Sequence, residues 1–290
     1  MIPSVPLNGG TTIPQLGFGT LRLPRDETAR IVGQVLDVGY RHIDTAQMYG
    51  TEEGVGAAIV ASGIPRDELY ITTKLANSNH LRDDVRRSFE ESLRNLRVEQ
   101  LDLFLMHWPL PTLYDGDYVS TWTAIAELLA DGRLRAVGVS NFQPEHLDRI
   151  INETGVVPAV NQIEAHPYFQ NDAARAASRR HGIAVEAWSP LGQGKVLNDQ
   201  VIGQIAQSLG RPTSQIILRW HIQRGDITIP RTVHRARMEE NHNIFDFELT
   251  PEHIATIDAL DEGADGRIGP NPDTFDWAGS GSPPASELRR

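Results

Sequence analysis

The stretch Asp83–His107, DDVRRSFEESLRNLRVEQLDLFLMH, carries a helix pattern and a strand pattern in succession. Its first half repeats apolar residues at helical spacing, at Val85, Phe89, Leu93 and Leu96. This spacing predicts an amphipathic helix over Asp83–Leu96. The run Leu101–His107 is short, rich in apolar residues and bounded by polar ones, which predicts a strand.

The same alternation continues along the chain. Short β-prone runs occur at Gly17–Thr20, Arg41–Asp44, Leu69–Lys74, Leu101–His107, Leu134–Ser140, Ala159–Ile163, Ala184–Ser189 and Ile227–Pro230. Amphipathic helical stretches separate them, and a second clear one is Ser120–Ala130. Eight strand–helix units predict an α/β protein with a (β/α)8 TIM barrel. A length of 290 residues suits such a barrel as a single domain, residues 1–290.

Both ends of the chain add to this barrel. At the front, VPLNGGTTIP (residues 5–14) places an Asn-Gly turn between two β-prone pieces, which predicts a hairpin that plugs the N-terminal end of the barrel. The last helical pattern spans Pro251–Leu260. Residues 261–290 are rich in Gly, Pro and Ser, and we expect them to form a C-terminal loop over the substrate mouth.

Composition excludes several classes of function. The chain has no cysteine, so disulfides, thiol nucleophiles and Cys-ligated metals are excluded, which suits the cytoplasm. It lacks a signal-like start and any apolar run near the roughly 18 residues of a membrane helix, so we expect a soluble, cytoplasmic protein. A net charge of −11 argues against nucleic-acid binding. An anionic ligand must therefore meet a local cluster of positive groups.

Polar residues stand at the C-terminal ends of the expected strands, where barrels of this kind carry their active sites. They are Asp44, Lys74, His107, Ser140, Asn141, Gln162, Glu164, Trp188, Ser189 and Arg231. Taken singly, Asp44 is typical of a turn, Lys74 of a solvated strand end and His107 of a core histidine. An Asp, a Lys and a His on three successive strand ends favour a catalytic site instead.

Tyr49 follows Asp44 closely and suggests the chemistry of this site. A free tyrosine is a weak acid, with a pKa of about 10, but a nearby ammonium such as Lys74 makes it a better proton donor. Asp44 can balance the charge of Lys74, and His107 can hydrogen-bond the substrate oxygen or the phenol. A general acid aimed at a developing alkoxide is half of a carbonyl reduction. The hydride must come from a redox cofactor.

Seven short motifs then resemble, in order, those of the aldo-keto reductase superfamily. They are DTAQMYG, ITTKLAN, LMHWP, GVSNF, NQIEAHP, WSPLGQG and IPRTVHRARMEEN. The resemblance spans Val5 to Asp261 and is greatest to bacterial members similar to 2,5-diketo-D-gluconate reductases. It implies a (β/α)8 barrel, NADPH as cofactor and a small carbonyl compound as substrate. It also implies a catalytic tetrad of Asp44, Tyr49, Lys74 and His107.

Matching positions imply the cofactor contacts. The resemblance assigns the nicotinamide carboxamide to Ser140, Asn141 and Gln162, the stacked aromatic to Trp188, and the pyrophosphate loop to Ser189, Leu191 and Gln193. It assigns the 2′-phosphate to Arg231, Thr232 and Arg237, and adenine to Glu240 and Asn241. Gly19, Thr20 and Asp44 are further expected contacts. Guanidinium groups suit phosphate oxygens, and Arg235 adds to the cluster. The chain has no complete G-x-G-x-x-G after a strand, so a Rossmann domain is not expected.

The expected substrate contacts are Leu21, Tyr49, Ala76, His107 and Trp108. Many family members carry an aromatic at the position of Leu21 and a Trp at that of Ala76, so we expect a wider, less aromatic pocket. Where Arg231 and Thr232 stand, the family often has Lys and Ser, which keeps the charge and the hydroxyl.

Other functions remain open at this point. Some members of the superfamily are redox-sensing subunits that bind the cofactor with little turnover. Lys74 is also a candidate Schiff-base nucleophile in a barrel aldolase. A metal-dependent hydrolase is not favoured, and no metal is expected, because the ten histidines show neither His-x-His nor H-E-x-x-H spacing. We expect a monomer.

Overall fold

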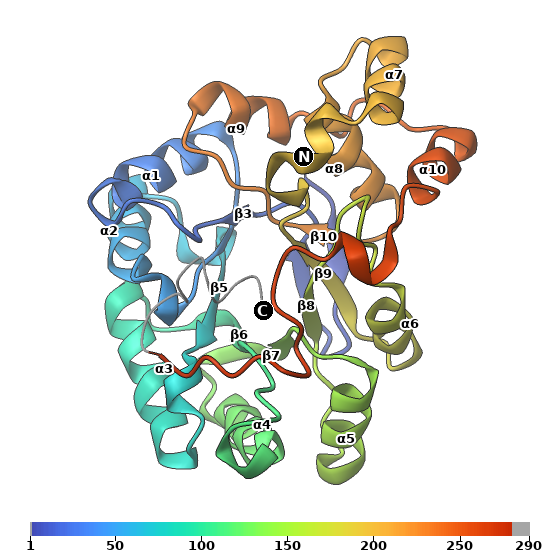
Figure 1. The fold of residues 1–290 in the computed structure, drawn as a ribbon. Coiled ribbons are helices and arrows are strands. Elements are labelled where there is room, and N and C mark those ends of the chain that lie inside the picture. Colours follow the sequence, from blue (N-terminus) through green and yellow to red (C-terminus); the bar gives the residue numbers. More distant parts are fainter. Residues whose placement is uncertain (1, 280–290) are drawn as a thin grey trace.

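A computed structural model describes residues 2–279 of the chain. Its centre is a sheet of eight parallel strands that neighbour one another in chain order (Figure 1). The strands are β3 (Phe18–Gly19), β4 (His42–Asp44), β5 (Tyr70–Leu75), β6 (Leu101–Met106), β7 (Leu134–Ser140), β8 (Val160–Glu164), β9 (Ala184–Trp188) and β10 (Ile227–Thr228). Every expected strand segment overlaps one of them, with ends that differ by at most two residues. The predicted (β/α)8 barrel is confirmed.

The sheet closes between its first and last strands. Leu16, two residues before β3, forms a parallel bridge with Thr228 of β10. The amide of Gly17 donates to the carbonyl oxygen of Thr228 at 2.9 Å, and the amide of Thr228 donates to that of Gln15 at 3.0 Å. Both otherwise open edges are thus paired, which turns the sheet into a barrel.

Helices surround the barrel (Figure 1). They are α1 (Thr28–Val38), α2 (Glu52–Ser62), α3 (Arg82–Leu96), α4 (Tyr118–Glu127), α5 (Pro144–Thr154), α6 (Asp172–Arg180), α7 (Gln200–Leu209), α8 (Thr213–Gln223), α9 (Arg235–His242) and α10 (Pro251–Asp258). Helices α1 to α6 each connect two successive strands, α7 and α8 both lie between β9 and β10, and α9 and α10 follow β10. None of the helices within residues 2–279 is long and apolar enough to cross a membrane.

The helix expected over Asp83–Leu96 is α3, which begins one residue earlier, at Arg82. The residues of its apolar stripe are all buried, and the ring of Phe89 lies 5.7 Å from that of Phe104 on β6, edge to face. Burying one such side chain contributes roughly 1.5–3 kcal/mol. The helix stops where Arg97 takes a left-handed conformation, at φ 55°.

The helix expected over Ser120–Ala130 has different ends. It begins at Tyr118, because the carboxylate of Asp117 accepts a hydrogen bond from the backbone amide of Ser120 at 3.0 Å and caps the first turn. It ends at Glu127, and a 3-10 turn, Leu128–Asp131, completes the segment. Capping and the tighter last turn were not apparent from the apolar spacing.

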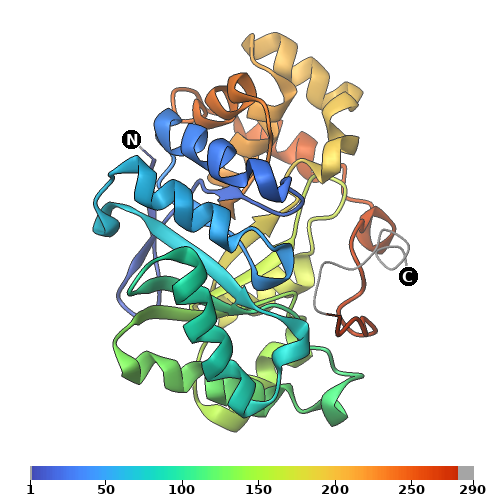
Figure 2. The ribbon, with the colours of Figure 1, turned by 90° about the vertical axis from the view of Figure 1, so that its left-hand side faces the viewer.

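The predicted N-terminal hairpin is present as β1 (Ser4–Pro6) and β2 (Thr12–Pro14), which pair antiparallel. Ile13 packs in an apolar cluster with Leu103 of β6 and Val160 of β8. The side-chain amide of Asn8 donates to the carbonyl oxygen of Pro158, just before β8, at 2.8 Å. These contacts place the hairpin across the N-terminal end of the barrel, opposite the C-terminal tail (Figure 2).

The tail after α10 contains one 3-10 turn, Gly263–Gly266, and otherwise no helix or strand up to residue 279. The rest of the expected loop, residues 280–290, lies outside the described residues. The ring of Phe275 packs against that of Trp108 with centroids 4.3 Å apart. The side-chain amide of Asn77, after β5, donates to the carbonyl oxygen of Trp277 at 2.8 Å. The tail therefore runs along the C-terminal ends of β5 and β6.

Candidate active site

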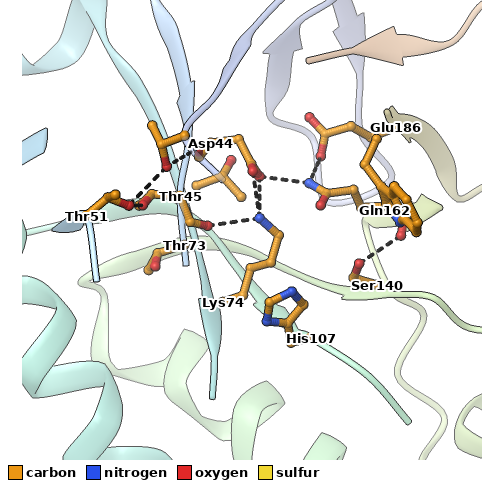
Figure 3. A network of polar contacts seen from close by, with 12 residues as sticks. Asp44, Thr45, Thr51, Thr73, Lys74, His107, Ser140, Gln162 and Glu186 are labelled. Carbon is orange, nitrogen blue, oxygen red and sulfur yellow. Dashed lines mark hydrogen bonds and ion pairs between the residues drawn. The ribbon is translucent and has the colours of Figure 1, made fainter. Parts of the chain in front are cut away.

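A buried ion pair lies at the C-terminal ends of β4 and β5. Lys74 Nζ donates to Asp44 Oδ1 at 2.6 Å, to Asp44 Oδ2 at 2.8 Å and to the carbonyl oxygen of Thr45 at 2.9 Å (Figure 3). Lys74 is fully buried and Asp44 is 2% exposed. All three ammonium hydrogens thus have an acceptor, which a buried cation requires to remain charged.

The pKa values of this pair follow from burial and mutual attraction. Burial is the largest single effect and lowers the pKa of Lys74, but Asp44, Tyr49 and Glu186 together outweigh it, so the pKa of Lys74 is raised. Burial also raises the pKa of Asp44, against the opposing effects of Lys74 and the Gln162 amide. Lys74 is therefore an ammonium at neutral pH.

Tyr49 reaches the pair from a 3-10 turn after β4, Gln47–Tyr49. The Gln47 side chain anchors this turn: its Nε2 donates to the carbonyl oxygen of Ser88 at 2.8 Å, and its Oε1 accepts from the amide of Ala76 at 2.8 Å. Lys74 Nζ lies 5.1 Å from the centre of the Tyr49 ring. The turn thus fixes the phenol beside the ammonium.

Burial, more than the ammonium, governs the acidity of Tyr49. Burial raises the pKa of the phenol, and Lys74 lowers it by a smaller amount. Lys74 thus acts on the pKa of Tyr49 in the expected direction, but burial, which the sequence analysis did not consider, has the larger effect, because it removes the charged phenolate from water. Tyr49 is protonated at neutral pH, as a proton donor must be.

His107 completes the group at the end of β6. Its ring lies edge to face with Tyr49, at a centroid distance of 5.6 Å. Burial, with the charge of Lys74 and the nearby His80, lowers the pKa of His107 well below its ordinary value of 6.5. The imidazole is therefore neutral, and it serves as a hydrogen-bonding group without a charge.

A cavity of about 690 Å³ opens above these residues. Most of the expected site residues line it: Gly19, Leu21, Asp44, Tyr49, His107, Trp108, Ser140, Asn141, Gln162, Trp188, Ser189, Leu191, Gln193, Arg231, Thr232, Arg237, Glu240 and Asn241. Three do not. Lys74 is fully buried, the Thr20 hydroxyl donates to the backbone carbonyl oxygen of Asp44 at 3.0 Å, and Ala76 is 5% exposed, with its amide bound to Gln47.

One wall of the cavity is fixed by hydrogen bonds between strand ends. Asn141 has a left-handed backbone, at φ 66°, and its Nδ2 donates to the carbonyl oxygen of His107 at 3.0 Å. Its Oδ1 accepts from Trp188 Nε1 at 2.8 Å. The Ser140 hydroxyl donates to the backbone carbonyl oxygen of Gln162 at 2.8 Å. The indole is thereby held in one orientation on the cavity wall.

The basic end of the cavity is formed by Arg22, Arg231 and Arg237. Among the described residues, no carboxylate lies within ion-pair distance of these three guanidinium groups. Arg235 is different: it pairs with Glu239 at 3.0 Å and with Asp37 at 3.7 Å, and it does not line the cavity. The expected cluster of three arginines after β10 is thus reduced to two, joined by Arg22 from the loop after β3.

Sequence analysis missed part of the lining. The missed residues are Arg22, Met48, Pro190, Gly194, Leu197, Pro212, Thr213, Ser214, Ile229, Pro230, Ile268, Gly269 and Pro270. Proximity in sequence to Ser189 and Arg231 could have identified several of them. Ile268 to Pro270 belong to the tail, which was expected over the substrate mouth, but none of its residues was singled out.

The chain was compared with known proteins. A profile described as the aldo/keto reductase family matches residues 14–262. The chain is 47% identical to an aldo-keto reductase of Mycolicibacterium smegmatis, over 96% of this chain and 100% of that protein. It is 42% identical to methylglyoxal reductase DkgA of Escherichia coli (strain K12), over 93% and 97% of the two chains.

Solved structures agree with these matches. The crystal structure of Gox0644 in its apo form superposes with a TM-score of 0.90, at 44% identity, over 94% of this chain and 98% of that one. A Gox0644 variant has been solved with NADPH. A Bombyx mori aldo-keto reductase in complex with NADP superposes with a TM-score of 0.85, at 36% identity, over 90% and 94% of the two chains. The chain therefore belongs to the aldo/keto reductase family of NADP(H)-dependent oxidoreductases.

The cavity suits such a cofactor. Its volume is in the range of about 300–1,000 Å³ that is typical of ligand sites. One end offers a fixed indole with amide and hydroxyl groups, and the other offers guanidinium groups without a carboxylate partner among residues 2–279. A nicotinamide ring matches the first environment, and a phosphate group matches the second.

Proposed function

We propose that this protein reduces small aldehydes or ketones to alcohols with NADPH, and that Tyr49 is the general acid. The observation that carries the proposal is the meeting of Tyr49, Lys74, Asp44 and His107 at the floor of the cavity that ends in Arg231 and Arg237. A proton donor and an anion-binding end thus belong to one continuous site.

In this proposal the cofactor lies along the cavity. Trp188 stacks on the nicotinamide, Ser140, Asn141 and Gln162 bind its carboxamide, and Arg231, Thr232 and Arg237 hold the 2′-phosphate. Ser189, Leu191 and Gln193 lie along the pyrophosphate, with Ser189 and Gln193 in left-handed conformations that curve the loop toward the cavity. Glu240 and Asn241 contact the adenine. When bound, NADPH supplies the hydride.

The protein supplies the proton. The substrate oxygen lies between Tyr49 and His107, and the neutral imidazole donates a hydrogen bond that stabilises the negative charge developing on that oxygen. Tyr49 transfers its phenolic proton to the oxygen, and the Lys74 ammonium stabilises the resulting phenolate. Asp44 keeps Lys74 charged and in place.

The proposed substrate is a small carbonyl compound. Leu21, His107 and Trp108 line the cavity together with Ile268 and Pro270 of the tail. Several relatives are named methylglyoxal reductase DkgA, and their identities of 41–43% support small oxo-aldehydes as the first compounds to test.

Two alternatives are less well supported. A Schiff-base aldolase needs a free amine, whereas Lys74 donates all three hydrogens to protein acceptors and is fully buried. A redox-sensing subunit needs cofactor binding but little turnover. The assembled acid, ammonium and carboxylate favour turnover, because binding alone does not require them.

We also propose that the enzyme acts as a monomer in the cytoplasm, which the absence of cysteine suits. Sedimentation at several protein concentrations measures the first point. A dimer at low concentration would contradict it.

The test of the main proposal is a screen of oxo-aldehydes, keto esters and sugar ketones, read by the loss of NADPH absorbance. We expect sustained turnover on at least one small carbonyl. A single slow turnover of bound NADPH, with no sustained rate on any compound, would favour the redox-sensing alternative. Borohydride trapping of a carbonyl compound on Lys74 would favour the aldolase.

A further inference from the structure

The carboxyl group of Glu186 lies inside the barrel, one hydrogen bond away from the proposed catalytic residues. Glu186 is fully buried in the middle of β9, in register with Gln162 on β8 and Ile227 on β10. Its Oε2 accepts from Gln162 Nε2 at 2.6 Å, and the same nitrogen donates to Asp44 Oδ2 at 2.8 Å (Figure 3). Sequence analysis considered only strand ends and therefore missed it.

This arrangement uses both hydrogens of the Gln162 amide. A primary amide has two N–H donors and one carbonyl acceptor. One donor is taken by Asp44 and the other by Glu186. Because the Gln162 side chain also lines the cavity, only its side-chain carbonyl oxygen, Oε1, remains to meet a ligand there.

We propose that Glu186 is a positioning residue for the reduction, which acts through the Gln162 amide to hold Asp44 and to present the Gln162 carbonyl oxygen to the cofactor. This inference rests on the proposed function, in which Gln162 contacts the nicotinamide carboxamide. Without the Glu186 acceptor, the amide is free to turn, and Asp44 loses a partner with a fixed direction.

The charges around Glu186 define a second consequence. Asp44 on β4 and Lys74 on β5 act on the charge of Glu186, and His42 on β4 lies beside it. The charge of Glu186 in turn acts on Tyr70 of β5 and on Tyr49. Burial, then the charge of Asp44, raises the pKa of Glu186 to about 8. Burial lowers the pKa of His42, whose Nε2 lies 3.6 Å from Glu186 Oε1, to about 3. Near pH 7 both groups are therefore neutral.

Above about pH 8 Glu186 ionises and adds a negative charge to the barrel interior. That charge opposes the loss of a proton from Tyr49 and Lys74, so it raises the pKa of both. Ionised Glu186 thus keeps the proton donor protonated to higher pH. A merely structural residue would not have this effect on a pH profile.

Three substitutions separate these roles. Glu186→Gln keeps an acceptor for Gln162 but cannot ionise, whereas Glu186→Met removes both properties at similar length. Glu52→Gln is the matched control: Glu52 is also buried, with a pKa raised by burial, but it accepts from Thr73 Oγ1 at 2.7 Å and does not contact Gln162 or Asp44.

Fluorescence titration with NADPH tests the positioning role without any turnover. We expect Glu186→Met to weaken NADPH binding about tenfold, the effect of one lost hydrogen bond to a buried group. In a Gln162→Met background the same substitution should add little, because Glu186 acts through that amide. Full additivity of the two losses would overturn the positioning role.

The pH dependence of kcat/KM tests the charge. We expect Glu186→Gln to move the alkaline limb to lower pH by roughly half to one unit, as expected for a charge that is near but not in direct contact. Glu52→Gln should leave the limb in place. An unchanged alkaline limb in Glu186→Gln would overturn the inference. If Glu186→Met does not fold, the pH profile of Glu186→Gln decides the question by itself. A wild type without turnover would contradict the proposed function, while the titration still tests Glu186.

Discussion

Positive charge lies both at the floor of the cavity, where Lys74 meets Asp44, and at its basic end, here called the rim. The charge at the floor is buried and paired, whereas the charges at the rim are exposed and unpaired among residues 2–279. At the floor, Lys74 is fully buried and bound to both oxygens of Asp44. At the rim, Arg231 and Arg237 are exposed, and no carboxylate of residues 2–279 lies within ion-pair distance. The floor is complete in the protein alone, whereas the charges at the rim remain available for a ligand.

Burial explains the difference. A charge inside a protein needs partners, and removing one partner leaves the other uncompensated, at a cost of about 3–5 kcal/mol. An exposed charge is solvated and screened by salt, so it interacts more weakly. Substitutions at the floor should therefore change catalysis and stability strongly. Substitutions at the rim should change mainly cofactor affinity.

The largest effect is expected for Tyr49→Phe. The substitution removes the proton donor and leaves the ring, so kcat should fall by about 10²–10⁴-fold while NADPH binding stays nearly intact. Steady-state kinetics and fluorescence titration measure the two quantities. Tyr40→Phe is the control, because the Tyr40 hydroxyl donates to the carbonyl oxygen of Met238, outside the cavity lining. A Tyr49→Phe enzyme with more than about a tenth of wild-type kcat would mean that another group is the acid.

Lys74→Met should remove activity and break the buried pair, with a loss of about 3–5 kcal/mol in the free energy of unfolding near neutral pH. Without the ammonium, the pKa of Asp44 rises further above its ordinary value of 3.8. The folded state then binds a proton that the unfolded state does not, so the variant should gain stability as the pH falls from neutral toward the ordinary pKa of 3.8, by up to about 1.4 kcal/mol per unit.

Urea unfolding at several pH values measures this slope against wild type. The double variant Asp44→Asn with Lys74→Met is the control, because it lacks the titrating carboxyl group and should lose the added slope. Equal slopes in Lys74→Met and wild type would mean that Asp44 is not sensitive to the ammonium. An active Lys74→Met enzyme would contradict the role of the pair in catalysis.

At the rim, Arg237→Ala should weaken NADPH binding by about one to two decades, while NADH binding changes little, because only NADPH carries the 2′-phosphate. Since the side chain is exposed, we expect the lower end of this range. Added salt should weaken the binding of NADPH more than that of NADH. Titrations with both cofactors at two ionic strengths measure these differences.

Arg235→Ala is the matched control for Arg237. Arg235 lies two residues away on the same helix but is already paired with Glu239 and Asp37. The Arg235→Ala substitution should leave the affinities for NADPH and NADH nearly unchanged. Equal losses of NADPH and NADH in Arg237→Ala would indicate that Arg237 supports the loop and does not bind the phosphate.

The smallest effect is expected for Arg82→Ala. Arg82 pairs with Glu127 at 2.6 Å between α3 and α4, with side chains 57% and 55% exposed. Its distance equals that of the Lys74–Asp44 pair, but such exposed pairs contribute only about 0–1 kcal/mol. Thermal unfolding measures this loss. A loss as large as that of Lys74→Met would mean that burial is not what separates the floor from the surface.

Sequence alone was sufficient for the barrel and for more than half of the residues that line the cavity. Strand and helix patterns depend on neighbours within a few residues, so Leu101–Met106 and the apolar stripe of α3 could be identified directly. The alternation of these patterns then placed the strand ends, and with them Asp44, Lys74 and His107, at one end of the barrel. Tyr49 was found because it stands so close to Asp44 in sequence.

Tertiary structure decided what depends on distant residues. Gln162 and Asp44 are 118 positions apart, and their bond follows from the closure of the barrel. The effect of burial on the pKa of Tyr49 was not predicted, because desolvation depends on everything packed around the ring. Arg235 and Arg237 are the same residue type two positions apart on α9. Arg235 forms an ion pair with Glu239, whereas Arg237 lines the cavity, and this difference is apparent only in the folded structure. Local periodicity depends only on neighbouring residues, whereas the burial of a side chain and its hydrogen-bond and ion-pair partners are determined only when the whole chain has folded.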